Sequence, residues 1–116
     1  MFEWLKGRSN RQQQEDLERR LKAITDQSIE VCKRTWADLH PTPNASMPSE
    51  QLAREIEEFA QSAFRFMFAQ FPIMKEAPPF HLWLVVFTAV LETKTLPTDN
   101  VNAAIDLLRA KYGPIA

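Results

Sequence analysis

The chain is poor in the residues that build tight turns and metal-held or disulfide-held sites. Of its 116 residues only two are glycine, one is cysteine and two are histidine. Scarce glycine argues against β-hairpins and phosphate-cradling loops, which need its backbone freedom. One cysteine excludes an internal disulfide and a CxxC site, and the two histidines do not form a zinc-binding pattern. We therefore expect no metal and no cofactor.

Charge of one sign, long apolar runs and catalytic motifs are also lacking. The 14 Lys and Arg residues against 15 Asp and Glu residues leave a net charge of −1, too small to attract nucleic acid or anionic lipid. No apolar run reaches the roughly 18–20 residues of a membrane span, and no secretory signal pattern opens the chain. GxSxG, HExxH, P-loop and GxGxxG motifs do not occur. We expect a cytoplasmic protein that is not an enzyme.

What the chain does have is one aromatic block, Phe59–Leu91. Twenty-two of its 33 residues are apolar, and it holds seven of the eight phenylalanines. Pro72, Pro78 and Pro79 divide it into two helix-length pieces, because proline removes a backbone donor and clashes with the preceding turn. The block therefore predicts two buried helices joined by a proline-rich elbow.

Hydrophobic periodicity predicts an all-α helical bundle with two long and two short helices. The predicted helices are 11–39, 48–71, 79–94 and 98–112. A buried strand competes for the third, because Val85, Val86 and Val90 are β-branched, but its length and leading prolines favour a helix. Residues 10–116 make one domain, preceded by a short apolar tip, 1–9. The long helices either pair within one chain or pair between subunits.

The first predicted helix carries an apolar-to-neutral row at steps of three and four. Its members are Leu17, Leu21, Ile24, Ser28, Val31 and Thr35. Pairs such as Glu30–Arg34 place an acid four residues before a base, which stabilises a helix by about 0.2–0.5 kcal/mol each. Cys32 lies one position round from the row, where we expect a buried or half-buried thiol. His40 ends the helix, where its imidazole can meet the last carbonyls.

The later helices have start signals of their own. Ser46 or Ser49 is expected to cap the second helix, with Pro48 in its first turn. Thr98 is expected to cap the fourth helix, and Gly113 follows its end as a stop signal.

The second and third helices have apolar residues on more than one side, which a four-helix domain does not usually bury alone. This surplus apolar surface can be buried in three ways: by self-association, by a protein partner or by an apolar ligand in a cavity. We expect a small protein that works through protein–protein interaction, of adaptor, regulator or inhibitor type, and forms a homodimer through these helices. The expected surface consists of Phe64, Phe68, Phe71, His81, Trp83 and Phe87.

Three other possibilities follow from particular side chains. An alternative function is binding of an apolar small molecule or haem in a cavity between the second and third helices. His81 would then supply the polar contact to the ligand. The acidic residues Glu50, Glu55, Glu57 and Glu58 form a solvated helix start or a docking patch for a basic partner. The tip residues Phe2, Trp4 and Leu5 suit docking onto the domain or a partner, and a membrane-surface contact is the third reading.

Overall fold

The computed structural model describes residues 11–41 and 46–113, and every regular element in these ranges is helical. The four α-helices are α1 (Arg11–Leu39), α2 (Ser49–Gln70), α3 (Pro79–Thr93) and α4 (Thr98–Tyr112). They confirm the all-α prediction, and each predicted boundary lies within one residue of the observed one. The elbow between α2 and α3 contains a short 3-10 helix, η2 (Pro72–Glu76), that was not predicted.

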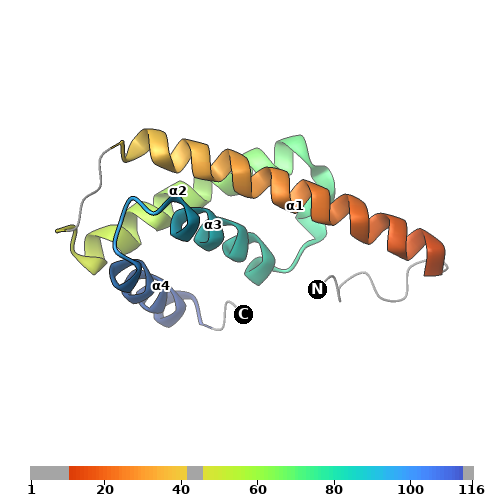
Figure 1. Ribbon diagram of the computed structural model, residues 1–116. Helices are drawn as coiled ribbons and strands as arrows, with labels where there is room; N and C mark the ends of the chain where they lie inside the picture. Colours follow the sequence, from red (N-terminus) through yellow and green to blue (C-terminus); the bar gives the residue numbers. More distant parts are fainter. Residues whose placement is uncertain (1–10, 42–45, 114–116) are drawn as a thin grey trace.

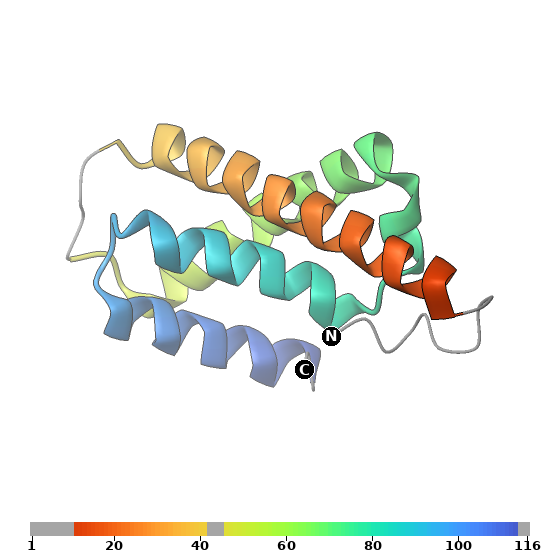
Figure 2. The same cartoon turned by 45° about the vertical axis from the view of Figure 1, so that its right-hand side comes forward.

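The helices pack as two pairs. α1 lies mainly on α3, and α2 lies mainly on α4. α1 and α3 run in one direction while α2 and α4 run back (Figure 1, Figure 2). α1 touches α2 only lightly, although these are the two longest helices and are consecutive in the chain. This weak pairing leaves the space between α1 and α2 in which the candidate site lies.

α3 is the central helix. It contacts α1, α2 and α4, and Figure 2 shows it between α1 and α4. Its buried residues are His81, Leu82, Trp83, Val85, Val86, Phe87, Ala89 and Val90. A helix with neighbours on three sides needs little polar surface. Most of the second apolar side of α3 is therefore covered by other helices of the same chain, while Phe80 and Leu84 stay exposed.

Proline, rather than a polar cap, begins three of the helices. Pro48 and Pro97 are the N-cap residues of α2 and α4, and neither makes a side-chain capping bond. The expectation that Ser46, Ser49 or Thr98 would cap these helices is therefore wrong. Ser49 and Thr98 instead occupy the first helical position, where the fixed φ of the preceding proline directs the chain into the helix.

The buried face of α1 follows the predicted row at Leu21 and Ser28 and departs from it by one position nearer the C-terminal end. Its fully or almost fully buried side chains are Leu21, Ser28, Cys32 and Trp36. Val31 is only half-buried and Thr35 is exposed. Trp36 offers the largest apolar area in this half of the helix, so its burial decides which face turns inward. Prediction of Cys32 as a buried thiol is confirmed.

Ion pairs on the outer face of α1 include one at the predicted four-residue spacing, Lys22 with Asp26 at 2.9 Å, but there the base precedes the acid. Asp16 pairs with Arg19 at 2.7 Å, three residues on, and Glu30 pairs with Lys33 at 3.4 Å rather than with Arg34. Lys33 also lies 3.4 Å from Glu92 of α3. The charged flank of α1 therefore contributes to its contact with α3 as well as to the helix itself. No helix in the described ranges is both long and apolar enough to cross a membrane.

Candidate binding groove between α1 and α2

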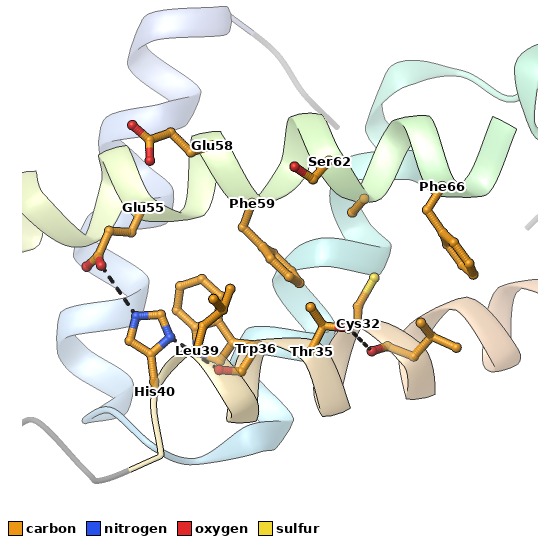
Figure 3. A pocket seen from close by; sticks show the side chains of 12 residues that line it. Cys32, Thr35, Trp36, Leu39, His40, Glu55, Glu58, Phe59, Ser62 and Phe66 are labelled. Atoms are coloured by element: carbon orange, nitrogen blue, oxygen red, sulfur yellow. Dashed lines mark hydrogen bonds and ion pairs between the residues drawn. The ribbon is translucent and has the colours of Figure 1, made fainter. Parts of the chain in front are cut away.

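An open groove with a volume of about 500 Å³ lies between the C-terminal part of α1 and the middle of α2 (Figure 3). We call it the α1–α2 groove. The residues that line it are Val31, Cys32, Thr35, Trp36, Leu39, His40, Glu55, Glu58, Phe59, Ser62, Ala63 and Phe66. Most of these side chains are apolar, and they come from segments more than ten residues apart in the chain.

The groove exists because short side chains face each other where the two helices separate. Thr35 on α1 and Ser62 and Ala63 on α2 are too small to fill the gap between the helices. Each helix is held by its own partner instead, α1 by α3 and α2 by α4, so neither helix closes onto the other. Protein interiors normally close such gaps to near-crystalline density. An open apolar gap of this size is therefore a surface feature available to a ligand or partner.

Aromatic rings form the base of the groove, and exposed apolar residues form part of its edge. The Trp36 and Phe59 rings meet edge to face, with centroids 5.1 Å apart. Both side chains are buried, whereas Leu39 is 60% exposed. Phe66 is half-buried at the opposite end (Figure 3). The walls thus have a rigid aromatic part and an exposed aliphatic part, as binding sites for apolar groups usually do.

One end of the groove is polar. The Nδ1 atom of His40 lies 3.2 Å from the carbonyl oxygen of Trp36 and must donate to it, since a carbonyl only accepts. The prediction that His40 meets the last carbonyls of its helix is therefore confirmed. Its Nε2 atom lies 3.5 Å from Oε1 of Glu55. His40 thus links the end of α1 to α2 (Figure 3).

Two polar atoms at this end have no partner among the described residues. They are the indole Nε1 of Trp36 and the second carboxylate oxygen, Oε2, of Glu55. A buried donor or acceptor without a partner costs about 1–3 kcal/mol, and more for a charged group. Glu58 lies one turn further along α2 and is exposed at the rim. The polar end therefore carries two carboxylates, one of them incompletely satisfied.

Cys32 contributes an uncharged thiol to the groove wall. Its side chain is 3% exposed, and burial raises the pKa of the thiol to about 11. A thiol that stays protonated is a poor nucleophile and a poor metal ligand. Cys32 therefore acts as a small apolar wall residue, and the described residues contain no group of three or more His, Cys, Asp or Glu side chains that could hold a metal ion.

The aromatic residues predicted as a partner surface lie mainly inside the fold. The Trp83 ring meets Phe64 edge to face at 5.3 Å and lies 5.4 Å from both Phe87 and Tyr112. Trp83 and Phe87 are buried, while Phe64, Phe68 and Phe71 are half-buried. These contacts join α2, α3 and α4, so this cluster serves as core between the helix pairs.

His81 is also an interior residue. It is 2% exposed, and its Nε2 atom lies 3.1 Å from Oγ1 of Thr25 on α1. Burial lowers the pKa of the imidazole. A hollow of about 170 Å³ beside His81 is lined by residues of α1 and α3, including Leu84 and Thr88. The space next to His81 therefore involves α1 and α3 rather than α2 and α3.

The four acidic residues of α2 do not form one patch. Glu55 and Glu58 line the groove, and Glu50 is exposed in the first turn. Glu57 points toward α4, where it pairs with Lys111 at 2.8 Å and accepts a hydrogen bond from the Tyr112 hydroxyl. Both contacts lower the pKa of the Glu57 carboxyl, with the Lys111 bond the larger cause. The predicted docking patch is thus divided between two faces of α2, and the tip residues Phe2, Trp4 and Leu5 lie outside the described residues.

The α1 side of the groove was not predicted from the sequence as a site. The periodic row predicts Val31 and Thr35 as core residues, and Leu39 enters the prediction only as the last residue of the first helix. The available signal was the presence of short residues, Thr35 on one helix and Ser62–Ala63 on the other, within otherwise bulky rows. That signal becomes usable only when the pairing of the helices is known. Comparison of the chain with models of protein families, with curated proteins and with solved structures found no match.

Proposed function

We propose that this protein is a binding module that holds an apolar segment of a protein in the α1–α2 groove. The observation that carries this proposal is the groove itself, an open apolar channel with carboxylates at one end and no lysine or arginine among its described lining residues. Grooves between helices commonly receive an amphipathic segment, which buries apolar anchors in the channel. The role expected from the sequence, protein–protein interaction, is kept, but its surface moves from α2 and α3 to α1 and α2.

The chemistry of the groove favours a segment that combines apolar and basic residues. Phe59, Phe66 and Leu39 offer contact area for apolar anchors. Glu55 and Glu58 near His40 favour a cation, because Glu58 is exposed at the rim and the Glu55 side chain is 35% exposed, so a lysine or arginine could pair with these carboxylates. Buried area provides most of the affinity, and the charges set the orientation of the segment.

A peptide titration tests the proposal. Two fluorescent amphipathic helical peptides with the same apolar spacing would be compared, one ending in two lysines and the other in two glutamates. We expect the lysine peptide to bind at least about tenfold more tightly. Leu39→Arg and Ser62→Arg should each weaken binding of the lysine peptide, because both add a positive charge to the groove and both residues are exposed enough to be replaced without unfolding the chain.

Matched controls are present on other faces. Leu107, on α4, is an exposed leucine outside the groove. Gln61 is next to Ser62 in the sequence but does not line the groove. Leu107→Arg and Gln61→Arg should leave peptide binding unchanged. Equal loss in the groove variants and the controls, or no binding of either peptide, would refute the proposal. An apolar ligand beside His81 is less favoured, since that hollow holds only about 170 Å³ and the imidazole already bonds to Thr25.

A further inference from the structure

The amino-terminal tip of this same chain has the chemistry that the groove selects. Residues 1–9 lie outside the described ranges. Phe2, Trp4 and Leu5 are large and apolar, and the basic residues Lys6 and Arg8 follow them, with Glu3 as the only acid. Aromatic anchors beside basic residues are what an apolar channel with a carboxylate end would bind.

The tip cannot lie along the groove of its own chain. The groove spans Val31 to His40 on α1, and Arg11 begins α1 at the opposite end (Figure 1). At 1.5 Å per residue, Arg11 and Val31 are about 30 Å apart along the helix. The nine steps from Arg11 back to Phe2 span at most about 32 Å when fully extended. Phe2 could only touch the near end, and Lys6 could not approach Glu55.

A second copy of the chain removes this difficulty. If two α1 helices lie antiparallel, Arg11 of one copy comes beside the His40 end of the other copy's groove. Because the chain before Arg11 heads away from that groove, the tip would have to turn back at Ser9 and Asn10 and would then run from the His40 end toward Phe66. Its order of residues matches the groove, because Arg8 and Lys6 would pass Glu55 and Glu58 before Leu5, Trp4 and Phe2 reach the apolar part.

Lengths agree as well. The groove covers eight helical steps of α1, from Val31 to Leu39, about 12 Å, and the tip from Phe2 to Arg8 spans about 9 Å as a helix or about 20 Å extended. Each copy has one tip and one groove, so a two-fold axis satisfies both at once and closes the assembly at two chains.

We propose that residues 2–8 of each chain occupy the α1–α2 groove of a second copy, giving a dimer held by reciprocal exchange of the tips. This proposal rests on the proposed function, since it names the segment that the groove binds. Apolar anchors Phe2, Trp4 and Leu5 lie between α1 and α2 of the partner, while Lys6 and Arg8 face Glu55 and Glu58. The exchange also covers the exposed Leu39 at the rim.

A charge-swap experiment on the full chain tests the exchange. Sedimentation equilibrium would measure dimerisation of the wild type, of a tip variant, Lys6→Glu with Arg8→Glu, and of a groove variant, Glu55→Lys with Glu58→Lys. Each variant alone should dimerise at least about tenfold more weakly, because like charges then meet at both ends of the exchange. An equimolar mixture should form heterodimers of wild-type strength, since each tip then meets a groove of opposite charge. Circular dichroism confirms that each variant keeps its helices.

Controls separate this inference from the proposed function. Asp99→Arg with Asp106→Arg reverses two exposed charges on α4 and should leave dimerisation unchanged. Trp4→Ala should weaken the dimer without changing the charge. A dimer weakened by the groove variant but not by the tip variants would overturn the exchange and leave the groove as a binding site for another segment. A wild-type chain that stays monomeric at millimolar concentration, yet binds the lysine peptide, overturns the exchange alone. Loss of both activities overturns both proposals.

Discussion

Thr25 of α1 and His81 of α3 are joined across the main helix interface, with Thr25 Oγ1 3.1 Å from His81 Nε2. The pair lies 56 residues apart in the sequence and places a titratable ring at 2% exposure in the most apolar helix. Burial lowers the pKa of His81 because the charged imidazolium loses its hydration. The contact that helps to hold α1 on α3 is thereby made sensitive to pH.

The first prediction concerns stability in mild acid. The unfolded chain keeps the ordinary histidine pKa near 6.5, whereas the folded chain has a lower one. Below about pH 6.5 the unfolded state therefore binds more protons, and the stabilisation present above that pH is lost as the pH falls toward the folded pKa. Urea unfolding between pH 7.5 and pH 5 should show this loss in the wild type and a smaller loss in His81→Gln. Thr25→Val keeps the titrating ring, so it should keep the pH dependence. A His81→Gln profile that parallels the wild type would refute the assignment.

A second prediction follows from Ser28, whose side chain is fully buried and whose hydroxyl has no partner among the described residues. Replacing it with alanine removes an unsatisfied polar atom and improves helix propensity. Ser28→Ala should raise the free energy of unfolding by about 1 kcal/mol more than Ser62→Ala, which changes an exposed serine. Chemical denaturation of the two variants measures the difference. A lower stability for Ser28→Ala would show that the hydroxyl is bonded in solution.

The boundaries of the helices were predictable because prolines and loop residues mark them locally. Pro48, Pro72 and Pro97 act within one turn of the chain, and their effect needs no knowledge of the fold. The inward face of α1 was less predictable, because burial of Trp36 competes with the row that ends in Thr35. Beyond Ser28 the buried residues lie one position later than the predicted row, and one position is about 100° around a helix. This rotation places Val31 and Thr35 in the groove.

The candidate site was harder to predict than the helices because it depends on which helices pair. Surplus apolar residues on α2 and α3 indicated that something must cover them, but the sequence did not show that α3 would be enclosed by α1, α2 and α4. Likewise Glu57 and Glu58 are adjacent in sequence, yet one pairs with Lys111 of α4 and the other lines the groove. Both outcomes depend on which helices contact each other, and local periodicity in the sequence does not predict these contacts.

The third prediction concerns the end of α3. Lys94 terminates this helix with φ of 58° and ψ of 28°, the left-handed region that suits glycine. For a residue with a Cβ, this backbone conformation costs about 1 kcal/mol of free energy. Lys94→Gly should therefore raise the free energy of unfolding by about 0.5–1 kcal/mol. The same change at Gln61, inside α2, should lower it by about 1 kcal/mol. Thermal unfolding of both variants would decide, and destabilisation by Lys94→Gly would contradict the strain at this position.

The last prediction uses Cys32, the only cysteine of the chain, as a reporter of the groove. Because burial raises the pKa of its thiol to about 11, the thiolate fraction at pH 8 is about two orders of magnitude below that of an ordinary cysteine. Reaction with an aromatic disulfide reagent should accordingly be slow in the folded protein and fast in urea. Its rate should also keep rising about tenfold per pH unit through pH 9 while the fold persists, instead of levelling off.

Because Cys32 lines the groove, addition of the lysine peptide should slow the reaction further, whereas the glutamate peptide should not. Rapid labelling of the native chain at pH 8 would show that the thiol is neither buried nor protonated, and unchanged labelling in the presence of bound peptide would place the peptide elsewhere on the protein.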